Sequence, residues 1–344
     1  MVLYIVYAIL IFLMLIFVHE AGHLISAKIS KIRVNEFALG MGPKIFGFTK
    51  GDTQYSFRAI PFGGYCAMEG ENDESDDPRA FGNKPARVRA FVLFAGSVMN
   101  ILLAIIVISL LIFYVGTPSR VLAAVEEDKP AYSDGLRAGD ELVAINGQPV
   151  SNWDDIVPRL REVAALDPEG NEQLVLTVMR DGAEKTIKTH FYKDANGDFK
   201  VGIIPAYSRD GTYFFKSFGK GTVETLFMTK MLYEVLRDLF TGKAGMEMLT
   251  GPVGIVVTVG EVAPYGAPNL FYLMALISLN LGIINLVPFP ALDGGRLLFL
   301  LIRKITGKAI TDEIEGRVHL VGILVLFGFL AIITFLDIDR FIIN

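Results

Sequence analysis

Two histidines and a glutamate directly follow a long apolar run near the start of the chain. His19, Glu20 and His23 lie in the sequence HEAGH, after the apolar or aromatic residues from Leu3 to Val18. On a helix, His19 and His23 are one turn apart on the same face. Two imidazoles with this spacing can hold one Zn²⁺, and the glutamate between them reaches the water that the metal binds.

The chemistry of such a site is hydrolysis. Zinc lowers the pKa of its water from 15.7 toward ~7, and Glu20 takes the proton and later hands it to a leaving amine. A random chain of this length contains the pattern only about once in a hundred. Ionisable side chains at membrane depth are costly and by default mark a functional site. We therefore predict a metal site at His19 and His23.

A catalytic zinc needs a third protein ligand and an open position. Asp293 is a better candidate for this third ligand than either of the remaining histidines. It ends the uncharged run NLGIINLVPFPAL, in which Pro288 and Pro290 must break a helix. Irregular backbone at membrane depth persists only where protein covers it or where it faces a water-filled cavity. The alternative is that Asp293 caps an interfacial helix that starts near Arg296.

The remaining histidines and the single cysteine are weaker candidates. His319 lies at the predicted start of the last span and is a second possible ligand, whereas His190 is expected on a hairpin surface of a soluble module. Because Cys66 is the single cysteine of this sequence, an internal disulfide framework and a cysteine-based structural zinc site are both excluded. Its neighbours Tyr65 and Ala67 supply no base that would make it a nucleophile.

The composition predicts a membrane protein. The chain has 344 residues, of which 52% are hydrophobic, and a mean hydropathy of +0.46, which several membrane segments would explain. The net charge of −5 gives no indication of a nucleic-acid partner. A span needs about 20 apolar residues. Four segments are long enough, at roughly 2–27, 90–115, 264–291 and 318–336.

Basic residues near the ends of the spans predict the orientation of the chain. Ten Lys and Arg residues lie between the first and second spans, and five lie between the third and fourth. Both connections are therefore expected to be cytoplasmic. Both termini and the long region 116–263 are then extracytoplasmic.

The regions outside the spans have distinct characters. The alternating segment TQYSFRAI predicts a strand in a cytoplasmic β-loop over 35–65, and ENDESDDPR predicts a solvated, mobile loop. A small α+β module, with a hairpin at Asp181-Gly182, is expected from 118 to 205. An amphipathic helix at 222–240 is expected on the membrane surface. The resulting organisation is a membrane core in two halves, 1–117 and 264–344, separated by the module 118–205 and by a helix and linker at 206–263.

HEAGH in the first span, NLVPFPALDGG in the third and the module between them resemble the site-2 protease family. The similarity is to the bacterial regulator-of-sigma-E type of intramembrane zinc protease, and it covers essentially the whole chain. GLRAGDELVAINGQPV is similar to the PDZ-like modules of periplasmic proteases. The resemblance implies a polytopic α-helical protein of the bacterial inner membrane. It would have four transmembrane helices, an inserted extracytoplasmic α+β PDZ-like domain, a membrane-associated β-hairpin and an active site toward the cytoplasmic side.

The resemblance also implies roles for individual residues. His19, His23 and Asp293 would be zinc ligands, and Glu20 the catalytic base. The implied activity is zinc-dependent cleavage of single-span membrane proteins within or near their membrane segment, as with anti-sigma factors or remnant signal peptides. Four further residues match positions implied in substrate binding: Gly96 and Asn100 in FAGSVMN, and Asn285 and Pro290 before the aspartate.

Several roles stay open at this point. A β-edge at 53–62 either pairs with an unwound substrate strand or belongs to an ordinary surface hairpin. Asn100 or Asn285 either donates to the oxyanion or hydrogen-bonds a neighbouring helix. The PDZ-like module either binds a peptide or regulator, or gates access to the site.

Two other functions compete with this interpretation. A membrane zinc protease of another type would take its third ligand from a glutamate on a later helix, and Glu313 and Glu315 are the candidates for that ligand. A non-catalytic, PDZ-bearing membrane adaptor would hold an inert zinc ion. In an adaptor, replacement of Glu20 by Gln would leave function untouched, whereas a protease would keep zinc and lose cleavage.

Overall fold

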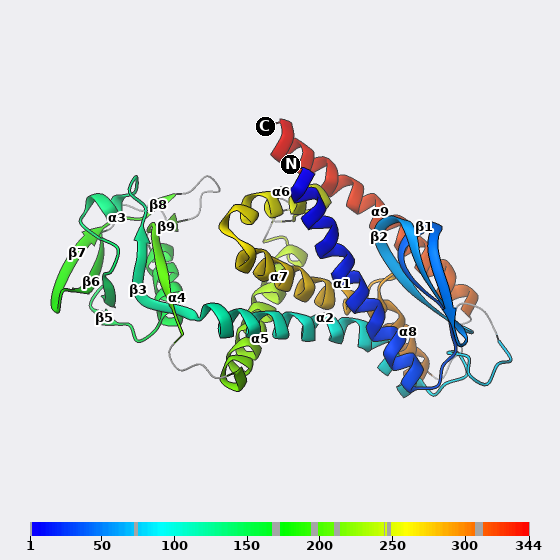
Figure 1. Cartoon of the computed structure of the whole chain (residues 1–344). Helices are drawn as coiled ribbons and strands as arrows, with labels where there is room; N and C mark the ends of the chain where they lie inside the picture. Colours follow the sequence, from blue (N-terminus) through cyan, green and yellow to red (C-terminus); the bar gives the residue numbers. More distant parts are fainter. Residues whose placement is uncertain are drawn as a thin grey trace. The chain divides into compact units, whose positions relative to one another are not determined.

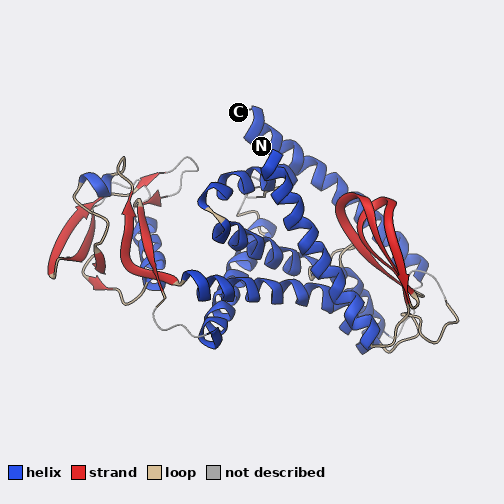
Figure 2. Ribbon diagram, in the orientation of Figure 1, coloured by secondary structure: helices blue, strands red, loops and turns tan. Residues whose placement is uncertain are grey.

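The computed structural model contains two compact units, Met1–Leu111 with Phe215–Asn344, and Ile112–Phe214. Each unit is described by itself (Figure 1). The first is mainly helical with one small sheet, and the second is rich in strands (Figure 2). The structure describes residues 2–71, 75–166, 173–193, 199–209, 214–243, 245, 249–306 and 312–343.

Four helices of the first unit are long and apolar enough to cross a membrane. They are α1 (Val2–Ile29), α2 (Ala86–Val115), α7 (Ala267–Asn285) and α9 (Asp312–Ile338). Their surfaces expose many large apolar side chains, such as Leu10, Leu102, Phe271 and Leu324. Exposed apolar surface of this extent is typical of contact with lipid rather than water. The chain is therefore a polytopic membrane protein with an inserted, β-containing unit.

The third of these helices ends before the prolines that the sequence predicts to break it. Of the expected span at about 264–291, α7 covers Ala267–Asn285 and stops three residues before Pro288. Leu286 and Val287 continue as a turn whose amides bond to carbonyls three residues back, and the ring of Pro288 then excludes further helix. The other helical elements of the unit are α5 (Phe214–Phe240), α6 (Pro252–Val262), η2 (Ala263–Tyr265), α8 (Asp293–Thr306) and η3 (Asp339–Ile343).

Asp337, near the end of α9, holds the start of α6. Its buried carboxylate accepts hydrogen bonds from the amides of Gly251, at 3.3 Å, and Gly254, at 2.8 Å. A helix N-terminus has unsatisfied amides and a partial positive charge, so a carboxylate there is stabilising. This contact joins the last long helix to the segment that leads into α7.

The sheet of the first unit consists of β1 (Val34–Lys50) and β2 (Thr53–Met68), and both strands fold over. Phe37 pairs with Tyr55 on one side and with Cys66 on the other, while Tyr55 also pairs with Phe48. The sheet therefore has four segments in the order 64–68, 34–39, 53–58, 46–50.

The pairing corrects the β-edge that the sequence indicates at 53–62. Residues 53–58 are an inner segment, with neighbours on both sides, so their backbone groups are already used. Alternating polarity identifies a strand but not its neighbours, which the fold-over of both strands determines. In the described part of the chain, 64–68 pairs with β1 alone and is an edge of the sheet.

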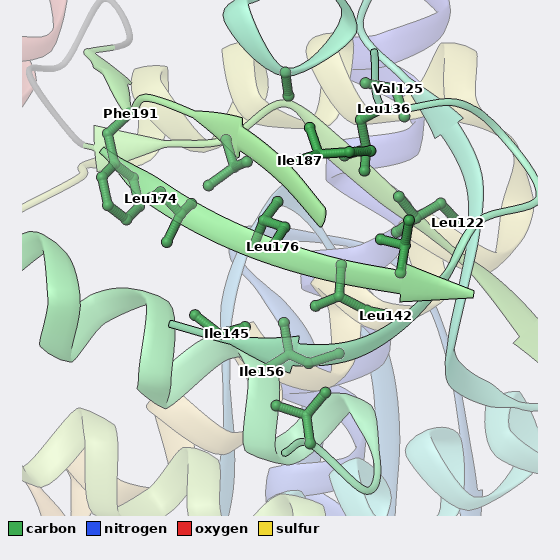
Figure 3. Close-up of a cluster of buried hydrophobic side chains, with 14 residues drawn as sticks. Leu122, Val125, Leu136, Leu142, Ile145, Ile156, Leu174, Leu176, Ile187 and Phe191 are labelled. Atoms are coloured by element: carbon green, nitrogen blue, oxygen red, sulfur yellow. The ribbon is translucent and has the colours of Figure 1, made fainter. Parts of the chain in front are cut away.

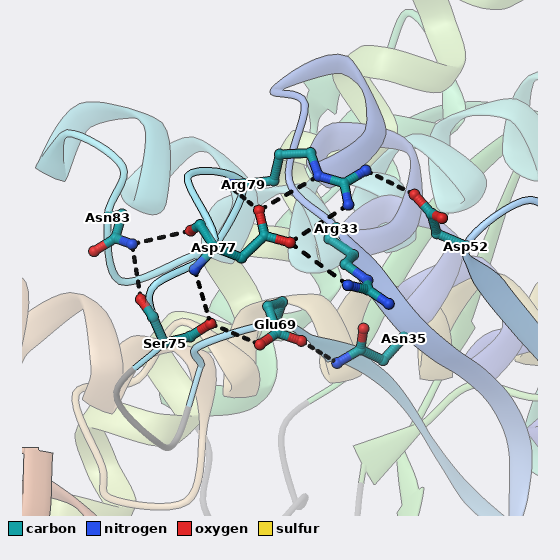
Figure 4. Close-up of polar contacts among 8 residues, drawn as sticks. All are labelled: Arg33, Asn35, Asp52, Glu69, Ser75, Asp77, Arg79 and Asn83. Carbon is teal, nitrogen blue, oxygen red and sulfur yellow. Dashed lines mark hydrogen bonds and ion pairs between the residues drawn. The ribbon is translucent and has the colours of Figure 1, made fainter.

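A polar network fixes the segment that follows the sheet (Figure 4). The Ser75 hydroxyl donates to Glu69, at 2.7 Å, and the Asn83 amide donates to the carbonyl oxygens of Ser75 and Asp77. Arg79 forms an ion pair with Asp52 at 2.7 Å. The predicted mobile loop is thus tied to the sheet from Ser75 onward, while 72–74 lie outside the described residues.

The inserted unit has a six-stranded sheet of order β10-β3-β4-β6-β7, with β5 paired to β4. Figure 3 shows its core of buried aliphatic side chains, among them Leu142, Ile145 and Leu176. The predicted hairpin at Asp181-Gly182 is confirmed, since Arg180 pairs with Ala183 across it. The elements of the unit are β3 (Thr117–Val125), α3 (Pro130–Ser133), β4 (Glu141–Ile145), β5 (Gln148–Pro149), α4 (Trp153–Leu166), β6 (Leu174–Arg180), β7 (Ala183–Thr189), β8 (Tyr192–Lys193), β9 (Phe199–Lys200) and β10 (Ile203–Ser208).

Candidate metal centre

α1 presents His19 and His23 from one face, as the four-residue spacing predicts. Both side chains are buried, and their Nε2 atoms lie 3.3 Å apart. The rings meet edge to face, with their centroids 4.9 Å apart. Because α1 is an unbroken helix through this stretch, the backbone fixes the separation of the two imidazoles.

Asp293, the first residue of α8, brings a carboxylate to the same point. Its Oδ2 atom lies 3.2 Å from Nε2 of His19 and 3.3 Å from Nε2 of His23. Zinc with tetrahedral bonds of about 2.0–2.1 Å has its ligand atoms about 3.3 Å apart. The mutual separations of the three donor atoms therefore fit a zinc ion, which His19, His23 and Asp293 would hold as three protein ligands.

A backbone carbonyl orients one of the imidazoles. Nδ1 of His23 donates to the carbonyl oxygen of Val92 on α2, at 2.9 Å. The proton is therefore assigned to Nδ1. Nε2 is then unprotonated, and its lone pair faces the space that it shares with Nε2 of His19 and Oδ2 of Asp293, as a metal ligand requires. Sequence reasoning missed Val92, because a carbonyl that any residue would supply leaves no signal in the side chains.

Close contact between α1 and α2 depends on two glycines. A Cβ atom on Gly96 would lie 2.4 Å from Nε2 of His23 and 2.8 Å from Cε1 of His19. A Cβ atom on Gly22 would lie 2.4 Å from the carbonyl oxygen of Ala95. Gly96 therefore packs directly against both imidazoles, and any side chain there would displace them.

A cavity of about 560 Å³ opens beside the three donors. Glu20 lines it together with Gly63 and the edge segment of the sheet, residues 64–68. A Cβ atom on Gly64 would lie 2.8 Å from Cγ2 of Ile16 and 3.3 Å from Cγ of Glu20, so only glycine lets the sheet come this close to α1. The strand backbone and the acid–base candidate therefore face the same space.

The residues implied in substrate binding occupy different surroundings. Asn285 lines the cavity, and Pro290 packs against α9 beside Gly322. Asn100 is fully buried, and neither polar atom of its side chain has a hydrogen-bond partner among the described residues. Of the two asparagines, Asn285 is the one that borders the open space.

Two titratable residues of the edge segment are unsuited to nucleophilic attack. Burial raises the pKa of the Cys66 thiol, so it stays protonated near neutral pH. Burial and a 2.8 Å hydrogen bond donated to Glu36 raise the pKa of Tyr65 to about 12. Neither residue is therefore in the deprotonated form that nucleophilic attack requires.

Two adjacent glycines allow the turn before Asp293 to lie directly on the start of α8. A Cβ atom on Gly294 would lie 2.2 Å from the carbonyl oxygen of Val287, and one on Gly295 would lie 2.3 Å from that of Phe289. Backbone oxygens cannot move aside as side chains can. The two positions after Asp293 must therefore be glycine for the turn to pack this closely on α8.

The other candidate ligands lie elsewhere. The carboxylate of Glu315 is held by Arg303 at 2.6 Å, and Nδ1 of His319 accepts the amide of Ala291. The side chain of Glu313 is outside the described residues, and His190 is exposed in the inserted unit. Among the described residues, one group of three or more possible ligands has atoms close enough to share a metal ion: His19, His23 and Asp293.

Comparison with known proteins gives a consistent family. A family model described as Peptidase family M50 matches residues 7–329. A Clostridium acetobutylicum protein named "Putative zinc metalloprotease" is 37% identical over 335 residues, which cover 97% of each chain. The zinc metalloprotease RasP of Geobacillus kaustophilus is 31% identical, with 97% of each chain covered. The regulator of sigma-W protease RasP of Bacillus subtilis is also 31% identical, over 96% of this chain and 97% of its own.

Proposed function

The chain belongs to peptidase family M50 and is a zinc metalloprotease, and on that premise we propose that His19, His23 and Asp293 are its zinc ligands and Glu20 its general base. One observation carries the proposal. Donor atoms from two elements far apart in the sequence converge with mutual separations of 3.2–3.3 Å, the spacing that a tetrahedral zinc ion requires.

Each residue of the site has a defined part in peptide hydrolysis. A bound zinc ion supplies Lewis acidity that polarises a carbonyl group and makes water acidic near neutral pH. Glu20, at the wall of the cavity, takes the proton of the attacking water and delivers it to the leaving amine. The carbonyl of Val92 keeps Nε2 of His23 directed at the centre throughout.

The substrate is a membrane-embedded segment that has lost its helical structure locally. A peptide bond inside a helix is shielded and already hydrogen-bonded, so it must unwind before attack. The edge segment 64–68 lines the cavity and pairs with β1 on one side only in the described chain. An unwound strand added to this edge would lie along the catalytic residues, with main-chain hydrogen bonds as its chief contacts.

Among polar side chains, Asn285 is placed to assist the reaction. Its position in the cavity lining supports a hydrogen bond from its amide to the oxyanion of the tetrahedral intermediate. Asn100 is enclosed between helices, which supports a role in packing instead.

The substrate class follows from the membrane setting and from one relative. We assign single-span membrane proteins, such as anti-sigma factors or remnant signal peptides, as substrates. The name of the Bacillus subtilis relative, regulator of sigma-W protease, supports this class. The excess of basic residues between the spans supports a cytoplasmic-side active site with both termini outside. The sheet and helices of the inserted unit support a PDZ-like domain that binds a peptide or gates access.

The substitution Glu20→Gln tests this function. The variant should keep its zinc, because the change removes a proton carrier and no ligand, while cleavage falls roughly 10²–10⁴-fold. Zinc content of the purified protein is measured beside membrane-protein fragments in cells with either form. Uncleaved single-span proteins should accumulate in the variant. Unchanged fragments would indicate an adaptor, and loss of zinc would make Glu20 a ligand.

A further inference from the structure

We propose that His319 is a positioning residue for zinc binding, which holds the turn before Asp293 in the conformation that presents the carboxylate. The inference rests on the proposed function, in which Asp293 is a ligand. Nδ1 of His319 accepts a hydrogen bond from the backbone amide of Ala291, at 2.9 Å. Ala291 precedes Asp293 by two residues, so this bond acts on the backbone immediately before the ligand.

The backbone held by this bond is strained. Ala291 has a φ of 83°, in the left-handed region that side chains other than glycine rarely adopt. Such a conformation persists only where the surroundings over-determine it, and it is found preferentially at functional sites. If φ returned to an ordinary negative value, the chain would leave Ala291 in a different direction and Asp293 would start α8 elsewhere.

α9 is the element that holds the turn. A Cβ atom on Gly322 would lie 2.6 Å from the carbonyl oxygen of Pro290, so the helix touches the turn backbone directly. His319 is three residues earlier on the same helix and therefore on the same face. Its side chain is only 13% exposed, and its ring lies 5.8 Å from that of Phe299 on α8. The imidazole thus sits between the turn and the helix that Asp293 begins.

The hydrogen bond from Ala291 assigns the tautomer of His319, and the surroundings of Nε2 favour the same tautomer. Because Nδ1 accepts the amide proton, the ring proton of neutral His319 is on Nε2. Nε2 faces Oε1 of Glu315 at 3.8 Å, and the same carboxylate is bound by Arg303 of α8 at 2.6 Å. A negative group beside Nε2 favours the proton there and leaves the lone pair on Nδ1. Glu315 therefore supports the ligand through His319.

A matched pair of substitutions separates the hydrogen bond from the volume of the side chain. Leu and Asn are similar in size, but only Asn offers an acceptor at the place of Nδ1. Zinc affinity of the purified full-length protein is measured by competition with a chelator. His319→Leu should weaken zinc binding roughly 10–100-fold, as loss of a partner that orients a ligand does. His319→Asn should stay within about threefold of the wild type, because its amide oxygen restores the acceptor.

A second substitution tests the strain itself. Glycine adopts positive φ at no steric cost. Ala291→Gly should therefore recover much of the zinc affinity that His319→Leu loses, since the turn no longer has to be forced. Equal affinity loss in His319→Leu with and without Ala291→Gly would overturn the proposal, as would equal loss in the Leu and Asn variants. If His319→Leu does not accumulate, His319→Phe removes the acceptor but keeps a ring.

Controls distinguish failure of this inference from failure of the proposed function. His190→Phe, at an exposed position of the inserted unit, should leave zinc affinity unchanged. Asp293→Ala should weaken zinc binding on the order of a hundredfold. If Asp293→Ala weakens zinc binding in this way and His319→Leu does not, only the positioning role is wrong. If Asp293→Ala keeps the wild-type zinc affinity, the ligand assignment itself is wrong.

Discussion

The proposed zinc ligands reach one point from two very different kinds of backbone. His19 and His23 project from the regular helix α1, whose own hydrogen bonds hold them one turn apart. Asp293 follows a turn with two prolines and a residue at positive φ. The two imidazoles therefore need little from the rest of the chain to be correctly spaced, whereas the carboxylate needs a great deal.

The two kinds of backbone depend on different residues to hold their ligands in place. The histidines of α1 depend on the neighbouring helix α2, which supplies the Val92 carbonyl and, at Gly96, a position without a side chain. Asp293 depends on its own segment, on the positive φ of Ala291 and on the two glycines that follow the aspartate. The ligand pair is thus sensitive to the packing of a second helix, and the third ligand to its own local conformation.

The largest expected loss of zinc affinity follows from replacing Asp293, the ligand that the turn presents. Asp293→Ala should lower zinc affinity on the order of a hundredfold, because one ligand's share of a zinc site's ~10–16 kcal/mol is about 3 kcal/mol. Cleavage should fall to background. Glu315→Gln removes no ligand and affects the centre only through His319, so this variant should still bind one zinc per chain.

Metal content and cleavage of a single-span test substrate are the measurements for both variants. Zinc retained by Asp293→Ala and lost by Glu315→Gln would transfer the third ligand to α9. In that case all three ligands would come from the regular helices α1 and α9, and the contrast between a helix and a strained turn would not apply to the metal site.

The next largest loss of zinc affinity is expected at Gly96, and it tests whether His19 and His23 depend on close packing against α2. Gly96→Ala should weaken zinc binding roughly tenfold to a hundredfold, because overpacking at the imidazoles costs about 1–3 kcal/mol. Gly328→Ala on α9 is the matched control, since nothing lies within 4 Å of its Cβ position. There, alanine should stabilise the helix by up to about 1 kcal/mol.

Zinc competition and thermal unfolding of the two variants give the comparison. Wild-type zinc affinity in Gly96→Ala would mean that α2 can move away from the imidazoles without cost, and that the close crossing is not needed for metal binding.

Local sequence predicts the α1 side of the site well. The spacing of His19 and His23 requires only the periodicity of a helix, and the apolar run before them predicts that helix. The four spans are predicted in the same way from length and hydropathy. Asp293 was identified as a candidate because Pro288 and Pro290 imply a break at membrane depth. All these signals act within a few residues of the feature they predict.

The features that the sequence could not predict depend on distant contacts. The position of 53–58 inside the sheet results from both strands folding over, which alternation of polarity does not encode. The strain at Ala291 could not be predicted from the sequence, because alanine ordinarily avoids positive φ and therefore gives no signal for such a turn. His319 was considered as a ligand, but its contact with Ala291 depends on where α9 crosses the turn.

The smallest expected effect compares one substitution in the two backbones. Ala291→Gly should stabilise the protein by roughly 0.5–1 kcal/mol, because relief of left-handed strain exceeds the extra freedom that glycine gives the unfolded chain. Ala21→Gly, inside α1, should destabilise it by about 1 kcal/mol. Thermal unfolding of the purified protein in detergent measures both shifts. Opposite signs are the expected result, because the same change removes strain in the turn and helix propensity in α1. Destabilisation by both would mean that Ala291 is not strained and that the turn is as relaxed as the helix.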